Sequence, residues 1–261
     1  MSDIHQRQKE LKGWNQDIIS NLTCLVLGVG GLGTNIAINL CRLGVKEIIL
    51  VDMDTVDCHN LNRQILYKHE DVGHSKVERA KEELMRHNNV SGTTITTLNI
   101  NALKEWNVTL EQIKRSGIIF NTIDHGDYFD IAVCNVARKY SIPLVLGGTE
   151  PFYGHTVSYF LQGVREIDPT YLDCHYIKEI NCCNKQTDFE SLNDISFLPS
   201  DSHPTVGGST VYSAGTCSHL MTSSIVNYLH HLQDVDRPDP PKQMIFNLMT
   251  MESDSWFSST K

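Results

Sequence analysis

A glycine-rich turn near the start of the chain constrains the fold more than any other feature. The continuous apolar run Leu22–Leu27 is typical of a strand buried on both faces of a parallel sheet. Gly28, Gly30 and Gly33 follow it directly as G-x-G-x-x-G, and a predicted helix, Leu32–Leu43, comes next. The backbone N–H groups of such a turn can approach a phosphate at the helix N-terminus. The turn therefore predicts a nucleotide-binding α/β fold.

The rest of the chain alternates between strand and helix patterns. Further strands are predicted at residues 46–51, 93–98, 118–122, 143–147, 156–161 and 244–249. Helices are predicted at residues 76–87, 102–114, 128–140 and 211–232, and apolar residues are spaced as in a helix over residues 4–20. This alternation indicates an α/β fold with a Rossmann-like, doubly wound and mostly parallel sheet.

We expect a single domain over residues 1–261. Its core would comprise about residues 20–162 and 205–250, separated by an irregular crossover excursion at about 163–204 that is rich in Asp, Asn, Cys and Ser. A loop of this length inside a compact domain is usually functional or mobile.

Composition and charge argue against several classes of protein. Hydrophobic residues make up 40% and charged residues 20%, which is typical of a folded globular protein. The net charge of −9 would repel a polyanion, so bulk nucleic-acid binding is not expected. No apolar stretch reaches the length of a membrane span. Most of the eight cysteines lie in apolar runs and no secretory signal opens the chain, so we expect reduced thiols and a cytoplasmic protein.

Two carboxylates follow the second predicted strand. Asp52 and Asp54 lie about 20 residues after the turn, where a carboxylate can accept hydrogen bonds from ribose hydroxyl groups. The turn and these carboxylates together indicate a nucleotide. On the turn alone an NAD- or FAD-linked oxidoreductase is favoured, and a tight turn without a ligand is the alternative.

A polar cluster after the second strand favours a triphosphate over a dinucleotide. Asn60, Arg63 and Gln64 belong to the segment HNLNRQ, and Lys76 begins a predicted helix. Arg63 offers a planar fork for phosphate oxygens and Lys76 offers a point charge. Asp124 follows the strand IIFNT, at the edge of the sheet that carries the turn. There it could hold Mg²⁺, which prefers one or two carboxylates plus phosphate oxygens.

Five ordered motifs resemble the ubiquitin-activating enzyme superfamily. They are GVGGLGT at 28–34, VDMDTVDCHNLNRQ at 51–64, GHSKVERA at 73–80, NTIDH at 121–125 and LGGTEPFYG at 146–154. The family includes the bacterial thiamine and molybdopterin adenylyltransferases and the eukaryotic activators of ubiquitin-like modifiers. The resemblance covers about residues 20–160 and the predicted helix near 206–231.

The resemblance implies ATP-dependent adenylation of the C-terminal carboxylate of a ubiquitin-like or sulfur-carrier protein, by a homodimer or a heterodimer. It also implies a role for each matching residue. Gly28, Gly30, Gly31 and Gly33 would form the turn, and Asp54, with Asp52 as a second candidate, would bind ribose. Asn60, Arg63 and Lys76 would hold the phosphates, Gln64 would be a further nucleotide-binding residue, and Asp124 would hold Mg²⁺. In the family an N-terminal arginine reaches into the partner's site, and Arg7 is the nearest match.

The cysteines depart from the family pattern. Many members pass the acyl group to a cysteine, and Cys182 or Cys183 in the irregular excursion would be the candidates here. Many members also bind zinc through two C-x-x-C pairs, but Cys174 is followed at position 177 by isoleucine and no C-x-x-C occurs. Zinc is therefore not expected in this chain.

Three alternatives stay open. The first is adenylation of a small-molecule or tRNA carboxylate, although the acidic balance argues against tRNA. The second is a noncatalytic half of a heterodimeric activating enzyme. Such halves commonly lose the arginine and lysine, whereas this chain keeps Arg63 and Lys76. The third is a plain NAD-dependent oxidoreductase.

Overall fold

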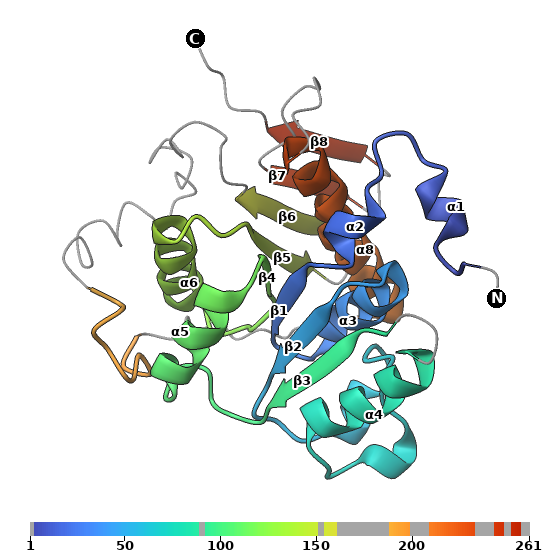
Figure 1. The fold of residues 1–261 in the computed structure, drawn as a ribbon. Helices are drawn as coiled ribbons and strands as arrows, with labels where there is room; N and C mark the ends of the chain where they lie inside the picture. Colours follow the sequence, from blue (N-terminus) through green and yellow to red (C-terminus); the bar gives the residue numbers. More distant parts are fainter. Residues whose placement is uncertain are drawn as a thin grey trace.

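The computed structural model describes residues 3–88, 92–150, 154–160, 188–198, 209–232, 243–247 and 252–256. Within these ranges, the strands form one eight-stranded sheet in the order β3-β2-β1-β4-β5-β6-β7-β8 (Figure 1). The strands are β1 (Thr23–Leu27), β2 (Glu47–Val51), β3 (Thr94–Leu98), β4 (Ile118–Asn121), β5 (Leu144–Glu150), β6 (Gly154–Phe160), β7 (Gln243–Asn247) and β8 (Glu252–Trp256).

Four helices connect the parallel strands: α3 (Gly31–Leu43), α4 (Lys76–Asn88), α5 (Trp106–Arg115) and α6 (Asp127–Lys139). Two short helices, α1 (Gln6–Lys9) and α2 (Gln16–Ile19), precede β1, and α8 (Val211–Leu232) lies between β6 and β7. Short 3-10 turns, η1 (Cys58–Asn60) and η2 (His69–Asp71), lie between β2 and α4. Among the residues described, no helix is both long enough and apolar enough to span a membrane.

Strands β1 to β5 are parallel to one another, and β6, β7 and β8 extend the sheet beyond β5 as antiparallel neighbours. The predicted Rossmann-like, doubly wound and mostly parallel sheet is confirmed. Leu27 at the end of β1 is in register with Val51 of β2 and Asn121 of β4. The segments that follow these three strands therefore emerge together at one edge.

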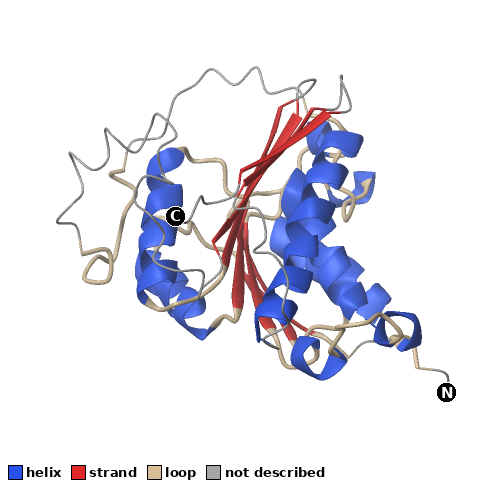
Figure 2. Cartoon of the chain, turned by 90° about the horizontal axis from the view of Figure 1, so that it is seen from above, coloured by secondary structure: helices blue, strands red, loops and turns tan. Residues whose placement is uncertain are grey.

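The sheet lies between two helical layers (Figure 2). One layer contains α3, α4 and α8, and the other contains α5 and α6. The sequence of β1 is continuously apolar because helices cover both of its faces. Cys24 and Val26 pack against the first layer, while Leu25 and Leu27 pack against the second. All four side chains are fully buried, as expected of a central parallel strand.

Some element boundaries differ from the predictions. The helix expected from residue 102 begins at Trp106, because the Asn101 carboxamide accepts hydrogen bonds from the N–H groups of Leu103 and Lys104 and holds a turn. Residues 4–20 form two short helices rather than one, with Gly13 between them at φ 84°. Strand β8 was not predicted, because its sequence ESDSW has several polar residues that are depleted in strands.

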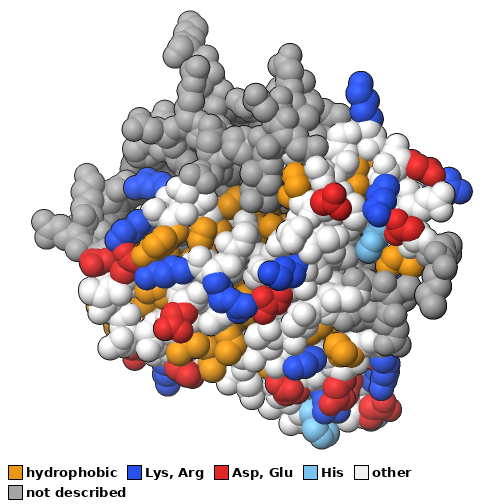
Figure 3. Space-filling view, viewed as in Figure 1, with side chains coloured by type: hydrophobic (Ala, Val, Ile, Leu, Met, Phe, Trp, Pro, Cys, Tyr) orange, Lys and Arg blue, Asp and Glu red, His pale blue; other side chains and the backbone are white. Residues whose placement is uncertain are grey.

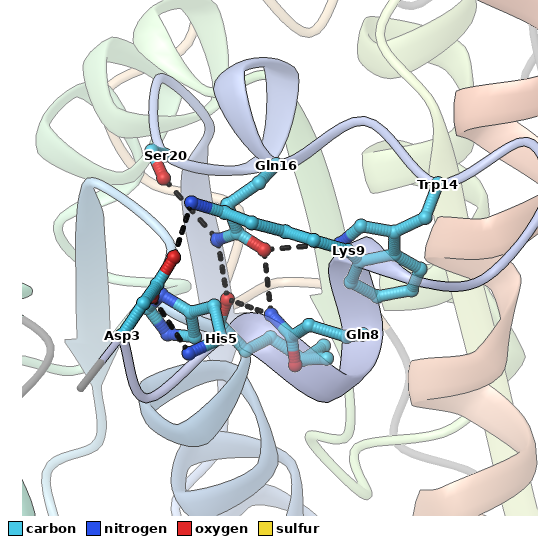
Figure 4. Close-up of polar contacts among 8 residues, drawn as sticks. Asp3, His5, Gln8, Lys9, Trp14, Gln16 and Ser20 are labelled. Carbon is cyan, nitrogen blue, oxygen red and sulfur yellow. Dashed lines mark hydrogen bonds and ion pairs between the residues drawn. The ribbon is translucent and has the colours of Figure 1, made fainter.

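The N-terminal segment packs on the far end of α3, the helix that begins at the glycine turn (Figure 4). The carboxamides of Gln8 and Gln16 both donate hydrogen bonds to the Leu43 carbonyl oxygen, at 3.1 and 3.0 Å. Trp14 donates to Gln16 in turn, at 3.0 Å. Gly44 ends α3 in the left-handed conformation at φ 77°, which glycine adopts without steric cost. The segment thereby satisfies a carbonyl at the C-terminus of α3 that the helix itself leaves unpaired.

Part of the predicted excursion packs on the second helical layer. In residues 188–198, Phe189, Ile195 and Leu198 are buried against α5 and α6. The indole N–H of Trp106 donates to the Phe189 carbonyl oxygen at 2.6 Å. Glu190 forms ion pairs with lysines of both helices. Residues 163–187 and 199–204 of the predicted excursion lie outside the described residues.

Candidate nucleotide-binding site

The glycine turn lies where β1 meets α3, and close packing explains two of its glycines. Gly28 has φ 87°, and a Cβ atom there would lie 3.0 Å from the Thr122 carbonyl group. A Cβ on Gly33 would lie 2.9 Å from the carbonyl carbon of Gly28 and would overlap its oxygen. Carbon atoms in contact are normally about 3.5–4.0 Å apart. The turn therefore tolerates no side chain at either position without moving the backbone.

Hydrogen bonds from β2, from the residue after β4 and from α3 hold the peptide groups of the turn. The Gly28 N–H donates to the Val51 carbonyl at 2.8 Å, and the Thr122 hydroxyl donates to the Gly28 carbonyl at 2.9 Å. The Gly30 carbonyl accepts from the backbone N–H and the hydroxyl group of Thr34. Within the described part of the chain, the N–H groups of Gly30 and Gly31 have no acceptor. These two donors are where an anion would bind.

The two predicted ribose carboxylates are both engaged with the protein. Asp52 accepts from the N–H groups of Val29 at 2.7 Å and Asp54 at 2.9 Å, so it links the turn to the segment after β2. Asp54 forms an ion pair with Lys76 at 2.7 Å. The Lys76 side chain is only 8% exposed, whereas that of Asp54 is 54% exposed. Asp54 is the more accessible of the two carboxylates.

The segment from Asn60 to Gln64 lies against the turn. The position of a Cβ atom on Gly31 is 3.5 Å from Cγ and Cδ of Arg63, and that on Gly30 is 3.7 Å from Nε2 of Gln64. The Arg63 guanidinium donates to the His59 carbonyl and the Asn62 side chain, both by Nη1. Asn60 is buried and forms a reciprocal cap with Asp57. Arg63 and Gln64 thus flank the two unpaired N–H groups.

Among the described residues, four buried polar atoms of the predicted motifs have no hydrogen-bond partner. They are Oε1 of Gln64, Oγ of Ser75 beside Lys76, Nε of Arg79 in the same motif, and Nε2 of His125 beside Asp124. Buried polar atoms in folded proteins nearly always have a partner, and a ligand can supply the missing one. The residues of this edge therefore fit a polar ligand such as a nucleotide.

Asp124 is exposed to solvent. It lies two residues after Thr122, whose hydroxyl group binds the Gly28 carbonyl of the turn. No group of three or more metal-ligating side chains occurs among the residues that the structure describes. A magnesium ion bound with a triphosphate needs only one or two protein carboxylates, so the metal role of Asp124 stays a prediction.

Sequence reasoning missed two hydroxyl groups that hold the turn, those of Thr122 and Tyr67. The Tyr67 hydroxyl donates to the Val29 carbonyl at 2.8 Å. Burial raises the pKa of Tyr67 well above its usual value, and the carboxylates of Asp52, Asp71 and Asp54 raise it further. The hydroxyl group therefore keeps its proton at neutral pH. The only signal in the sequence was the position of Tyr67 shortly after HNLNRQ.

The cysteine predictions are resolved in part. Cys24, Cys41 and Cys217 are buried, as expected of packing residues, and burial raises the pKa of Cys217 to about 12. The predictions of a thioester at Cys182 or Cys183, and of no zinc at Cys174, concern residues outside the described ranges. Arg7 is exposed in α1, next to the C-terminal end of α3 and away from the glycine turn of its own chain.

A hollow of about 600 Å³ lies at the opposite edge of the sheet, where β1 and β4 begin. Its lining includes Asn21, Thr23 and Arg115. Arg115 is already paired with Glu47 at 2.6 Å. In parallel α/β sheets ligands bind at the carboxyl ends of the strands, so the glycine-turn edge is the candidate site.

Comparison with known families identifies the chain. A sequence profile of the ThiF family matches residues 5–259. The chain belongs to the ThiF family. Among curated proteins, it is 31% identical over 150 residues to SUMO-activating enzyme subunit 2 of Dictyostelium discoideum, covering 58% of this chain and 22% of the relative. It is also 31% identical over 153 residues to the NEDD8-activating enzyme E1 catalytic subunit of Caenorhabditis elegans, covering 54% and 34%.

Solved structures show the same fold. Escherichia coli MccB determined with ATP aligns with a TM-score of 0.65 and 21% identity, over 92% of this ThiF-family chain and 64% of MccB. The structure titled SeMet PaaA aligns with a TM-score of 0.65 and 20% identity, over 92% and 64%. The chain thus spans about a fifth to a third of the two curated relatives, and somewhat under two thirds of these structures.

Proposed function

We propose that this ThiF-family protein uses ATP to adenylate a carboxylate, the C-terminal one of a ubiquitin-like or sulfur-carrier protein. The observation that carries the proposal is the convergence at one sheet edge of the unpaired Gly30 and Gly31 N–H groups, Arg63, and the Lys76–Asp54 pair. A dinucleotide oxidoreductase needs the turn and an acidic residue but has no need for two cations beside them.

The reaction joins two negatively charged groups. A carboxylate oxygen of the partner forms a bond to the α-phosphorus of ATP, and the bond from that phosphorus to the bridging oxygen of pyrophosphate breaks. Positioning and fixed positive charge lower such a barrier more than a general base does. Arg63 supplies a bidentate donor, and Lys76 supplies an ammonium group held in place by Asp54. The oxygen of Asp54 that does not bind Lys76 could accept a ribose hydroxyl.

Mg²⁺ would join the site together with ATP. Asp124 is the residue that would hold it, with phosphate oxygens completing its shell. The ion would neutralise phosphate charge as the phosphorus centre becomes crowded.

The choice of a protein carboxylate rests on the relatives. Two of them are named for activation of SUMO and NEDD8, and one MccB structure is titled as a complex with N-formylated MccA. We also propose a homodimer or heterodimer, since two relatives are named as subunits, with Cys182 or Cys183 as acceptor in a later thioester step. The proposal of a cytoplasmic protein rests on the cysteine pattern of the sequence alone.

A tRNA carboxylate is less suited to this surface. On the face shown in Figure 3, basic side chains are interspersed with acidic ones, and the chain carries a net charge of −9. A polyanion gains little from such a distribution. The proposal of a noncatalytic half is opposed by the presence of Arg63 and Lys76 at the turn.

ATP–pyrophosphate exchange tests the proposal. The protein is incubated with MgATP, labelled pyrophosphate and candidate ubiquitin-like or sulfur-carrier proteins, and exchange is expected only with a matching partner. Arg63→Ala should reduce the exchange rate on the order of 100-fold, as the loss of one charge-stabilising group typically does. Arg138→Ala, at an exposed arginine of α6 in the second layer, is the matched control and should stay within about twofold. Undiminished exchange by Arg63→Ala would contradict the mechanism.

Binding separates the proposal from the oxidoreductase alternative. ATP, but not NADH, should raise the melting temperature of the wild-type protein, because a ligand of the folded state stabilises it by mass action. The reverse result would favour the oxidoreductase.

A further inference from the structure

The residue between the first two glycines, Val29, is held on both sides by side chains from outside the turn. Its N–H donates to Asp52 at 2.7 Å, and its carbonyl accepts from the Tyr67 hydroxyl at 2.8 Å. Val29 is fully buried and Tyr67 is 7% exposed. Water therefore does not compete for the buried Tyr67 bond, whereas the Asp52 bond is only partly buried. The conformation of the turn depends on these bonds as well as on its glycines.

Holding a carbonyl also sets the direction of the next N–H. In a trans peptide the C=O and N–H bonds point in opposite directions, and no cis peptide bond occurs among the described residues. Tyr67 binds the Val29 carbonyl and so fixes the Gly30 N–H. Thr34 binds the Gly30 carbonyl and so fixes the Gly31 N–H. Both N–H groups lack an acceptor within the described part of the chain, so hydroxyl groups aim two adjacent donors.

We propose that Tyr67 is a positioning residue of the nucleotide site, whose hydroxyl group orients the Gly30 N–H towards the phosphates of the nucleotide. The inference rests on the proposed function, because it requires a phosphate-bearing ligand. Tyr67 itself does not touch the nucleotide, since it lies behind the turn and is buried. Phenylalanine would fill the same volume but would leave the Val29 carbonyl without its donor.

The test compares two variants that each remove one buried hydroxyl group. Tyr67→Phe removes the proposed positioning bond. Thr109→Val is the matched control, because the Thr109 hydroxyl is fully buried in α5, on the other side of the sheet, and donates to the Ala102 carbonyl at 2.9 Å. Loss of such a bond lowers stability in both variants, so melting temperature serves as the common reference.

Affinities for ATP and for adenosine, measured by calorimetry or competition, distinguish a misplaced Gly30 N–H from a general loss of folded structure. Tyr67→Phe should weaken ATP binding about three- to tenfold, the loss expected for one hydrogen bond, while adenosine affinity stays within about twofold because adenosine carries no phosphate. Thr109→Val should change neither affinity. Wild-type ATP affinity in Tyr67→Phe, or equal losses for ATP and adenosine, would overturn the inference.

Amide hydrogen exchange of the ligand-free protein supplies a readout that needs no nucleotide. The Val29 N–H should exchange faster in Tyr67→Phe than in the wild type and in Thr109→Val, because the turn gains freedom to reorient. If the wild-type chain binds no ATP, the proposed function fails. The exchange rate still separates the two failures: an increase shows that the Tyr67 hydroxyl holds the turn although the nucleotide assignment is wrong, and an unchanged rate overturns the inference itself.

Discussion

Gly33→Ala is expected to be one of the most destabilising single-methyl additions in the site. A Cβ atom at Gly33 would lie 2.9 Å from the Gly28 carbonyl carbon and would overlap the oxygen. The normal separation of two carbons is about 3.5 Å or more, so the start of α3 must move away from the turn by at least about half an ångström. Gly28 resists this movement, because its N–H and carbonyl are bonded to Val51 and Thr122.

The size of the effect follows from that crowding. Overpacking a buried site costs about 1–3 kcal/mol, and we expect the upper end because both sides of the contact are backbone. For a domain of this size about 3 kcal/mol corresponds to roughly 6–12 °C in melting temperature. Gly31→Ala is the matched control. A Cβ there would lie 3.4 Å from Ala214 and 3.5 Å from Arg63, which are ordinary contacts, so its stability should change by less than about 1 kcal/mol.

Urea unfolding measures both variants. The buried indole of Trp106 reports loss of tertiary structure by fluorescence, and circular dichroism reports loss of helix. The slope of the unfolding free energy against urea concentration should be unchanged, so that only the midpoint concentration of unfolding shifts. If Gly33→Ala were as stable as the wild type, α3 would not approach the Gly28 carbonyl group as closely as the structure has it. A Gly31→Ala protein destabilised equally would show that the crowding is not specific to Gly33.

Three further predictions concern the described residues outside the turn. Iodoacetamide should label Cys58 in the native protein well before the buried thiols, because Cys58 is exposed, as peptide mass spectrometry can determine. Glu83→Gln should lower stability at pH 7 by up to about 1 kcal/mol, and its melting curves should converge with those of the wild type as the pH falls below 4.5. The reason is that a hydrogen bond from Lys68 lowers the pKa of Glu83, so its stabilisation is present above its usual value of 4.5 and is lost on protonation. Trp106→Phe should speed proteolysis within residues 188–198, because it removes the donor that anchors that segment.

Each of these predictions has a contradicting result. Slow labelling of Cys58 in the folded state would place that thiol in the interior. A Glu83→Gln deficit that persisted at pH 3 would show that the effect does not arise from the charge. Unchanged proteolysis in Trp106→Phe, with the fold retained, would show that the buried apolar side chains of residues 188–198 hold the segment without the indole bond.

The long apolar elements were predictable from the sequence, and the irregular ones were not. Strand β1 and helix α3 appear within one residue of their expected bounds, because a buried strand and a glycine-capped helix have strong local signals. The start of α5 and strand β8 were missed. The first depends on a side-chain turn at Asn101, and the second on pairing with β7 rather than on its own composition.

The candidate site shows the same division. The placement of the glycine turn, Asp52 and Asp124 at one edge followed from their positions after parallel strands. The Asp52 bonds to Val29 and Asp54 could not be foreseen, because a carboxylate at that edge can face a ligand or the backbone and only packing decides between them.

The sequence alone determined which residues end the parallel strands, since hydrophobic periodicity and glycine spacing act over a few neighbouring positions. Only the tertiary structure decided which polar groups meet across distant segments. Tyr67 reaches Val29 across 38 positions, and Lys76 reaches Asp54 across 22. Bonds of this kind form when helices and sheet pack together and bury polar groups, because a buried polar group without a hydrogen-bond partner costs about 1–3 kcal/mol of stability.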